Sequence, residues 1–315
     1  MRVAVLGPIP RDVIVTCEGW TDERYGGALY TTAVLASLGA GLLDVHPVAH
    51  VSAAELPDIR AMLARFGAVD PARISARHDR GTAIHLRYRD HNRRDETQVA
   101  CMAPIRPCDL DGLEGCDAFV VVPITDHEIP LATLRTLRAR SDGLIVFDAH
   151  GPTMGCAPDG TRFRKPWTDR DAWLPQIDLL KMNLEEARHV WFEREDLEEP
   201  TLAELPRLAE ICLAGGVRAL CVTLDRDGCV VYDRLRGRLR ERVVPRVPVE
   251  RVVDTTGCGD SFAAGMALGH LLHGDLLIAA RLGNYAGARR CLSRSLDAYG
   301  TLAEAEACLA DAYAG

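Results

Sequence analysis

The chain has 315 residues, of which 48% are hydrophobic and 26% are charged, and its formal net charge is −8. This length and composition allow a large buried core and exclude collagen-like, coiled-coil and broadly disordered chains. The net negative charge argues against a nucleic-acid partner, because such a partner requires a basic surface. No apolar run reaches the roughly 18 residues of a membrane-spanning helix. Pro8 and Pro10 interrupt the short N-terminal apolar run, so we expect neither a membrane partner nor a secretory signal.

The eleven cysteines are spread along the chain, and none of them belongs to a C-x-x-C pair. Their spacing matches neither a zinc site nor a disulfide framework. Reduced, mostly buried thiols are typical of proteins in a reducing compartment. We therefore predict a cytoplasmic location.

Apolar runs with strand character alternate along the chain with segments of helix character. In chain order we expect a strand at Val3–Leu6, a helix at Thr31–Leu38, a strand at Ala118–Val122, a helix at Leu131–Arg140, strands at Leu144–Phe147 and Leu179–Met182, a helix from Leu184, a helix at Leu202–Ala214 and a strand at Ala219–Thr223. These strands are apolar throughout, which is typical of a parallel sheet covered on both faces. The sequence therefore predicts an α/β fold with a mostly parallel central sheet flanked by helices on both faces.

One stretch departs from this pattern. Thr82–Arg89 alternates apolar and polar residues, Asp90–Asn92 can form a turn, and Asp95–Val99 can return as a second strand. Such a pattern indicates an antiparallel hairpin with one solvated face. We expect a single domain over residues 1–315, with a small β-sheet lid contributed by approximately residues 11–25 and 80–101.

The segment with the most chemical information is VVDTTGCGDSFAAG at Val252–Gly265, where a polar loop with two glycines runs into a helix of small residues. Gly257 and Gly259 let backbone N–H groups face outward, and a helix N-terminus carries a partial positive charge. Together they predict an anion site suited to phosphate oxygens. Asp260, at the start of this helix, can accept a proton from an attacking hydroxyl group, or can serve only as a helix cap.

The segment Asp254–Phe262 resembles the C-terminal signature of the ribokinase-like (PfkB) kinases, a pattern close to D-T-x-G-A-G-D-x-F, with Cys258 where alanine or glycine is usual. Weaker similarities extend along nearly the whole chain. They are a first strand that closes at Asp12, a glycine pair at Gly26-Gly27, an N-x-x-E segment at Asn183–Glu186, and a turn at Thr223–Gly228 similar to T-x-G-x-x-G. The resemblance implies the ribokinase-like fold, with helices on both faces of the sheet and a β-sheet lid.

By this resemblance the protein transfers the γ-phosphoryl group of ATP to an alcohol group of a small polyhydroxylated substrate. The implied catalytic residues are Asp260 as the base and Gly257, Cys258 and Gly259 as the anion hole. The implied binding residues are Asp12, Gly26, Gly27, Thr31 and His85 for the substrate, and Asn183, Glu186, Thr223, Asp225, Gly228 and Asn284 for the nucleotide.

The resemblance also implies sites for two metal ions. Glu186 is expected to order Mg²⁺ through water, because this ion prefers waters together with one or two carboxylates. Asp254 and Thr256 fall where many relatives hold a monovalent cation, so a K⁺ site is an option at these residues.

Several residues depart from the family pattern. Asp225 replaces the usual glycine of the nucleotide turn and brings a carboxylate near the donor phosphates, which weakens binding unless Arg226 or magnesium offsets it. Thr31 replaces an asparagine that contacts sugar hydroxyls in relatives. In the lid, Ala83 occupies the position where sugar-phosphate kinases carry a basic residue, and His85 lies two residues further on.

We therefore predict a free sugar or polyol as the acceptor, and a nucleoside as the first alternative. Trp20, Tyr25 or Tyr30 could stack on a nucleoside base, although packing within the protein is an equal use for them. A sugar-phosphate kinase and a non-catalytic ligand-binding protein of the same fold remain further alternatives. Asp148 and His150 follow a strand at the edge of the sheet where ligands bind and could contact the substrate. An exposed hairpin edge also invites a homodimer through the lid.

Overall fold

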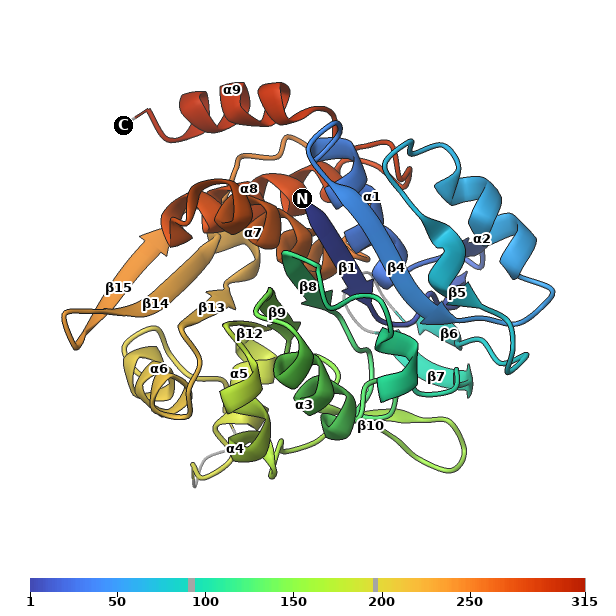
Figure 1. Cartoon of the computed structure of the whole chain (residues 1–315), viewed down its shortest axis with the longest axis horizontal. Helices are drawn as coiled ribbons and strands as arrows, with labels where there is room; N and C mark the ends of the chain where they lie inside the picture. Colours follow the sequence, from blue (N-terminus) through green and yellow to red (C-terminus); the bar gives the residue numbers. More distant parts are fainter. Residues whose placement is uncertain (90–93, 195–197, 315) are drawn as a thin grey trace.

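The computed structural model describes residues 1–89, 94–194 and 198–314. Nine strands of this part of the chain form one sheet, in the order β15-β14-β13-β12-β9-β8-β1-β4-β5 (Figure 1). All pairs from β13 to β5 are parallel, and β14 and β15 add an antiparallel edge. The strands are β1 (Arg2–Leu6), β4 (Asp44–His50), β5 (Ile74–Ser75), β8 (Ala118–Val121), β9 (Leu144–Asp148), β12 (Leu179–Asn183), β13 (Ala219–Thr223), β14 (Cys229–Leu235) and β15 (Arg238–Val244). The predicted mostly parallel sheet is confirmed.

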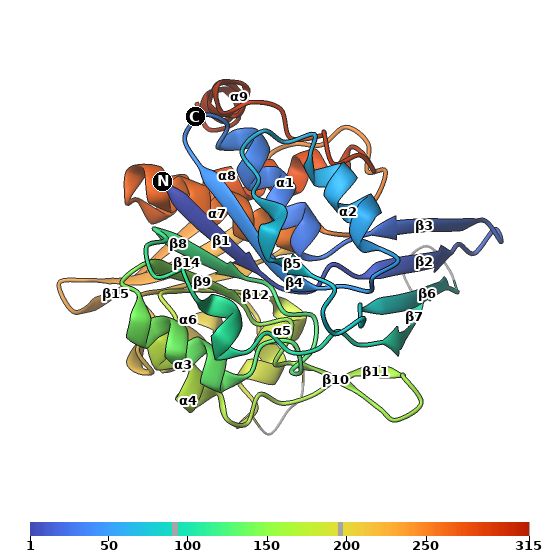
Figure 2. The ribbon, with the colours of Figure 1, turned by 45° about the vertical axis from the view of Figure 1, so that its right-hand side comes forward.

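Helices cover both faces of this sheet, as Figures 1 and 2 show. One face carries α1 (Ala28–Leu38), α2 (Leu56–Leu63), α7 (Cys258–His273), α8 (Leu276–Cys291) and α9 (Leu302–Ala312), and the other carries α3 (Leu131–Arg140), α4 (Arg170–Trp173), α5 (Leu184–Val190) and α6 (Leu205–Ala214). Short 3₁₀ turns lie at Pro71–Arg73, Pro107–Leu110, Leu174–Gln176 and Asp225–Asp227. Alternate residues of β1 enter opposite cores, Val3 and Val5 on one side and Ala4 and Leu6 on the other. This double burial explains why the strand is apolar throughout.

The helices of the structure begin and end close to the bounds predicted from the sequence. The helix predicted at Leu131–Arg140 is α3, with the same bounds. The first helix begins at Ala28, three residues earlier than predicted, directly after Gly27. α6 begins at Leu205 rather than Leu202, because Pro206 is suited to the first turn of a helix.

A second, four-stranded sheet has the order β3-β2-β6-β7 and stands apart from the large one (Figure 2). Its strands are β2 (Arg11–Val15), β3 (Thr21–Tyr25), β6 (Ala83–Tyr88) and β7 (Arg94–Ala100). β2 and β6 pair in parallel, whereas β2–β3 and β6–β7 are antiparallel. These strands lie in the two segments predicted for the lid, and the turn predicted at Asp90–Asn92 lies outside the described residues. We call this sheet the small sheet.

The hairpin of β10 (Met154–Cys156) and β11 (Arg162–Arg164) lies beside the small sheet. The backbone N–H of Gln98 in β7 donates a hydrogen bond to the Gly160 carbonyl oxygen at 2.8 Å, and Thr97 bridges to Thr161. Sequence analysis did not anticipate this hairpin, which brings Arg162 and Arg164 to the cavity described below.

The strand order reverses direction at β1, since β4 follows on one side of it and β8 pairs on the other. In open parallel sheets, ligands bind outside the carboxyl ends of the strands at such a switch point. In the described part of the chain, no helix is both long and apolar enough to cross a membrane.

Candidate active site

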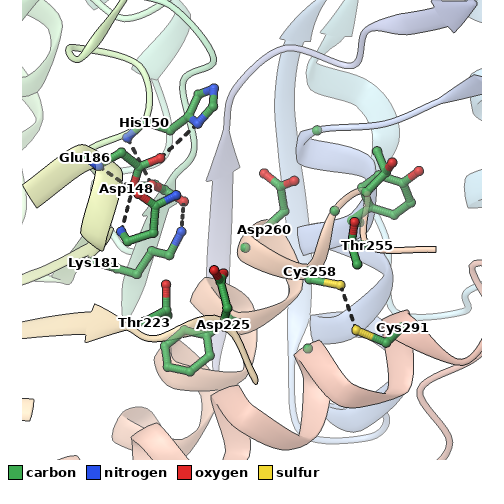
Figure 3. A pocket seen from close by; sticks show the side chains of 18 of the residues that line it. Asp148, His150, Lys181, Glu186, Thr223, Asp225, Thr255, Cys258, Asp260 and Cys291 are labelled. Atoms are coloured by element: carbon green, nitrogen blue, oxygen red, sulfur yellow. Dashed lines mark hydrogen bonds and ion pairs between the residues drawn. The ribbon is translucent and has the colours of Figure 1, made fainter. Parts of the chain in front are cut away.

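A cavity of about 950 Å³ opens at the carboxyl ends of the central strands. Its wall combines residues that follow β1, β8, β9, β12 and β13, the start of α7, and β6 of the small sheet. Segments that are far apart in the sequence, from Pro10 to Cys291, therefore share one site. Figure 3 shows Asp260 in the middle of it, with Asp148, His150, Lys181 and Glu186 grouped on one side.

The anion loop, residues 254–259, ends in a tight turn at the N-terminus of α7. Gly257 has φ +83°, and a Cβ atom built on it would lie 2.3 Å from the Tyr30 ring. Only glycine satisfies both the left-handed backbone and this close approach. Gly257, Cys258 and Gly259 line the cavity beside Asp260 at this helix N-terminus, and the anion hole expected of their backbone N–H groups stays a prediction.

Asp260 has an environment suited to a general base. Burial and the nearby Asp148 raise its pKa to about 6, against the opposing effect of Lys181 and His150. A base with a pKa close to the working pH combines a useful ionised population with good affinity for a proton. Thr31 donates a hydrogen bond from its hydroxyl group to the backbone carbonyl oxygen of Asp260 at 3.2 Å.

Lys181 is a charged residue of the site that sequence reasoning missed. Its ammonium group donates to Asp148 at 2.9 Å, and both side chains are almost fully buried. Burial alone would lower the pKa of Lys181, but Asp148 and Glu186 hold it above its ordinary value, so the ammonium group stays charged. It also lies 3.0 Å from where a Cβ atom on Gly259 would be, directly beside the anion loop. The available signal was a lysine at the end of an apolar strand, in a chain with only two lysines.

Asn183 and Glu186 form the start of α5. The Asn183 side chain accepts a hydrogen bond from the Glu186 N–H at 2.7 Å, and Glu186 accepts one from the Asn183 N–H at 2.9 Å. Glu186 also bonds to His150 Nδ1 at 3.0 Å. Burial alone would raise the pKa of Glu186, but Lys181 and His150 hold it well below its ordinary value. Glu186 is therefore a buried, ionised carboxylate at the cavity wall.

Asp12 faces the same cavity from β2. Its side chain is 4% exposed, and Oδ1 has no hydrogen-bond partner within the described structure. Burial raises its pKa to about 7, against the opposing effect of Arg24 and Arg162. An unpartnered buried carboxylate oxygen is costly unless a ligand donates to it. Gly27, expected at the substrate, lines the cavity, whereas Gly26, also expected there, does not line it and packs against the Asp12 carboxylate.

Two further residues expected at the substrate, His85 and Thr31, do not line the cavity. Ile84 and Leu86 of β6 line the cavity, so His85 lies on the opposite face of the strand, where it is exposed. The alternation of side chains along a strand makes this outcome unavoidable. Thr31 is fully buried, does not line the cavity, and contacts Asp260 instead of a substrate.

The residues predicted for the nucleotide all line the cavity, at the end of β12, the start of α5, the end of β13 and the turn after it, and α8. They are Asn183, Glu186, Thr223, Asp225, Gly228 and Asn284. Asp225 has φ +49°, a left-handed conformation that suits the glycine usual in the family. Asn284 is buried and donates from its amide group to the Pro245 carbonyl oxygen at 3.0 Å and to the Tyr313 hydroxyl at 3.2 Å, so it holds the adjoining loop in place.

An apolar slot continues this side of the cavity. Its lining consists of Ala288 of α8 and three valines from the segment after β15, Val247, Val249 and Val252. Cys258 at the start of α7 lies beside Cys291 at the end of α8, with 3.2 Å between the two sulfur atoms (Figure 3). The slot has the apolar lining that a flat nucleobase requires.

Both carboxylate oxygens of Asp254, expected at a K⁺ site, accept hydrogen bonds within the protein. Its Oδ2 accepts hydrogen bonds from Arg290 at 2.9 Å and from Arg24, while Oδ1 accepts the Thr256 N–H at 3.0 Å. The hydrogen bond from the Thr256 N–H, together with Arg24 and Arg290, outweighs the effect of burial and holds the pKa of Asp254 below its ordinary value. Within the described residues, no three His, Cys, Asp or Glu side chains are grouped to ligate a metal directly.

The architecture is the ribokinase-like α/β fold. The family model described as pfkB family carbohydrate kinase matches residues 162–299. An inositol 3-kinase from Oryza sativa is 28% identical over 303 residues, covering 90% of this chain and 66% of the relative. A sugar kinase from Archaeoglobus fulgidus is 34% identical over 113 residues, covering 33% of this chain and 43% of the relative.

Among solved structures, a pyrophosphate-dependent kinase of the ribokinase family superposes with a TM-score of 0.77 at 19% identity, covering 98% of this chain and all of that one. Alignment with the two curated relatives thus spans only 43% to 66% of their length. The chain thus has the ribokinase-like fold, and its residues 162–299 match the PfkB family model, in agreement with the resemblance of the sequence motifs.

Proposed function

We propose that this protein is a kinase that transfers the γ-phosphoryl group of ATP to a hydroxyl group of a free sugar or polyol. The observation that carries the proposal is the position of Asp260. Its carboxyl group, with a pKa near 6, lies between the anion loop and the part of the cavity lined by Asp12. The kinase names of the relatives support the same activity.

The proposed transfer needs three actions from this chain. Asp260 takes the proton from the acceptor hydroxyl, whose oxygen forms a bond to the γ-phosphorus while the bond to the bridging oxygen of ADP breaks. Backbone N–H groups of the anion loop hold the charge on the phosphoryl oxygens, the type of stabilisation that usually contributes most. Lys181 adds a fixed positive charge beside that loop.

The site fits Mg²⁺ bound mainly by the donor phosphates and water. Asn183, Glu186 and Asp148 offer oxygen atoms at the wall of the cavity, and Glu186 is ionised. The hydrogen bonds that already occupy Glu186 favour contact through water, in line with the preference of Mg²⁺ for its waters. When bound, the ion would neutralise charge on the phosphate oxygens.

The acceptor wall favours a polyhydroxylated ring. Asp12 supplies an unpartnered carboxylate oxygen for hydroxyl groups, and Ile84, Leu86 and Ile124 supply an apolar surface for C–H groups. A nucleoside is less favoured, because Trp20 does not line the cavity and Arg290 lies 4.5 Å over the Tyr30 ring. Arg162 leaves a sugar phosphate open as an acceptor, although its guanidinium group already donates to the Ile124 carbonyl oxygen.

The donor is the least constrained part of the proposal. The apolar slot at Val247, Val249 and Ala288 supports a nucleotide. Asp225, by contrast, brings negative charge to the phosphate side, and one structural relative is named as pyrophosphate-dependent. Pyrophosphate, which has no base to fill the slot, is therefore the second donor to test.

Two further features belong to the proposal. We propose a cytoplasmic setting, where ATP is present and the eleven unpaired thiols would stay reduced. We also propose a homodimer through the small sheet, whose strand β3 is an open edge.

The experiment that tests the function is release of ADP, or of phosphate from pyrophosphate, across a panel of acceptors. The panel contains free sugars, polyols including myo-inositol, nucleosides and sugar phosphates. We expect turnover that depends on a sugar or polyol and falls by about 10²–10⁴-fold in Asp260→Asn. If the wild type shows no acceptor-dependent turnover, while a panel member still raises its melting temperature, the non-catalytic alternative is the correct one.

A further inference from the structure

The anion loop is anchored by one buried arginine on α8. The Arg290 side chain is fully buried, and its Nη2 donates both to Asp254 Oδ2 at 2.9 Å and to the Tyr30 hydroxyl at 3.2 Å. Its Nη1 donates to the Ser293 carbonyl oxygen. The guanidinium group thus joins the start of the anion loop, the segment after α8, and α1.

The Tyr30 ring transmits this anchoring to the turn of the loop. Arg290 lies 4.5 Å from the centre of the ring, and the same ring packs against Gly257, whose left-handed backbone shapes the turn. Arg290 therefore fixes the loop at two points, at Asp254 by an ion pair and at Gly257 through Tyr30. It touches none of the reacting groups, so its role is that of a positioning residue.

A monovalent cation does not fit at Asp254. Both carboxylate oxygens already accept hydrogen bonds, and two guanidinium groups, from Arg290 and Arg24, supply more positive charge than the single carboxylate balances. A further cation at this place would meet like charge in a buried environment, where screening is weak. Of the side-chain oxygens of Asp254 and Thr256, the buried Thr256 hydroxyl has no hydrogen-bond partner among the described residues, and it is a single neutral ligand.

We propose that the guanidinium group of Arg290 takes the place of a monovalent cation beside the anion loop, so that the protein works and folds without K⁺. The part of this inference that concerns turnover rests on the proposed function. The part that concerns the stability of the folded protein is independent of it. The K⁺ option raised for Asp254 and Thr256 is thereby replaced by a side chain of the protein itself.

The two arginines at Asp254 are not equivalent. Arg24 comes from β3 of the small sheet and its side chain is 15% exposed, whereas Arg290 is fully enclosed and bonds to a neighbouring backbone carbonyl oxygen. A side chain that is fixed by several contacts can replace a bound cation, because it stays in one position beside the carboxylate. Arg290 is therefore the residue to substitute.

The first arm of the experiment measures the wild type in K⁺, Na⁺ and tetramethylammonium chloride, at a constant ionic strength of about 0.1 M. We expect the melting temperature and kcat to be the same in all three salts. A ligand that binds the folded state must raise its stability, so a rise in melting temperature that is specific to K⁺ would overturn the proposal.

The second arm uses Arg290→Ala, with Arg294→Ala as the matched control, since Arg294 is 60% exposed and lies in the following loop. We expect kcat of Arg290→Ala to fall by about tenfold to a hundredfold with little change in the KM of the acceptor, because the loop is displaced rather than the substrate. Added guanidinium ion or K⁺, but not tetramethylammonium, should increase the kcat of Arg290→Ala several-fold and raise the melting temperature of this variant. Arg294→Ala should respond to none of them.

Two outcomes keep the inference open to refutation if Arg290→Ala does not fold. Arg290→Lys keeps the positive charge, so we expect it to fold and to remain independent of K⁺, and a K⁺ requirement in this variant would contradict the proposal. If no acceptor supports turnover, the proposed function fails, while the melting temperatures in the three salts still decide the role of Arg290.

Discussion

Asp12, which is buried, and Asp260, which is half-buried, are two carboxyl groups with different partners in one cavity. Burial is the main cause of the raised pKa of each, to about 7 for Asp12 and about 6 for Asp260. Arg24 and Arg162 oppose the rise at Asp12, and Lys181 and His150 oppose it at Asp260. Both carboxyl groups therefore change their charge near neutral pH.

The raised pKa of Asp260 predicts a pH dependence of turnover. A general base acts in its ionised form, so kcat should rise with pH through about 6 and level off above it. The measurement is kcat at saturating donor and acceptor between pH 5 and 8, with product quantified directly so that no coupling enzyme contributes. Asp260→Asn should lose this rise together with most of its activity. An unchanged rise in the variant would assign the titration to another group.

The raised pKa of Asp12 predicts a cost in stability. Its folded-state pKa near 7 exceeds the ordinary value of 3.8, so the folded protein retains a proton that the unfolded chain releases between these values. Stability therefore falls as the pH rises through this window. Asp12→Asn should increase the free energy of unfolding more at pH 8 than at pH 5, by at most about 4 kcal/mol, in urea titrations. The same difference at both pH values would contradict the assignment.

Asp225 allows a test of charge at the donor turn. Asparagine tolerates the left-handed backbone at this position, so Asp225→Asn removes the charge and keeps the conformation. We expect a several-fold lower KM for ATP with little change in kcat, measured at fixed free magnesium. Asp227→Asn in the same turn, outside the cavity lining, is the control. A higher KM in Asp225→Asn would mean that this carboxylate assists donor binding.

At the scale of elements, α7 connects the chemistry to the core. Its first turn carries the anion loop and Asp260, and the rest of its small side chains pack closely against α8. Its two ends differ in their surroundings, although a left-handed glycine caps each of them: Gly257 meets the Tyr30 ring, whereas Gly274 faces open space.

This difference predicts the effect of two identical substitutions. Gly274→Ala should cost about 1 kcal/mol of stability, from the left-handed backbone alone, and leave kcat unchanged. Gly257→Ala adds a collision with Tyr30, so we expect a larger loss of stability and a loss of kcat of about a hundredfold. Thermal unfolding and steady-state kinetics of the pair provide the check. Equal effects would show that Tyr30 does not support the loop.

The sequence predicted the elements whose signals are local. Apolar runs identified the parallel strands, and the long motif at Asp254–Phe262 identified the anion loop and Asp260. It did not predict contacts that only the fold creates, such as the pair of Lys181 with Asp148, or Arg162 carried in on the β10–β11 hairpin. His85 was misplaced because a motif position does not reveal which face of a strand points inward.

The whole molecule consists of a layered α/β body and a small sheet that face each other across the cavity. The residues proposed to bind the donor come from the β13, α7 and α8 region, while those proposed for the acceptor, such as Asp12 and Ile84, come from the small sheet. A closing movement of the small sheet would exclude water from the transfer, which is the usual function of such lids. The lid remains a prediction, as do the bounds proposed for it.

The open edge of the small sheet predicts self-association. Trp20, at the turn between β2 and β3, is 75% exposed, and β3 has a free edge. Light scattering should therefore give a particle of two chains of 34.4 kDa each. Trp20→Glu should shift this equilibrium towards the monomer, whereas Leu235→Glu, at an exposed apolar residue at the end of β14, should not. A wild-type monomer at high concentration would exclude the dimer.

The scarcity of lysine has a practical consequence for handling the protein. Acylating reagents attack neutral, accessible amines, and Lys181 is neither, because it is buried and held protonated by Asp148. Lys165, the other lysine of the chain, is 33% exposed and lies outside the cavity lining. Amine-directed dyes or supports would therefore attach at Lys165 or at the Met1 amino group, both outside the cavity lining, and leave the cavity accessible for ligand screening.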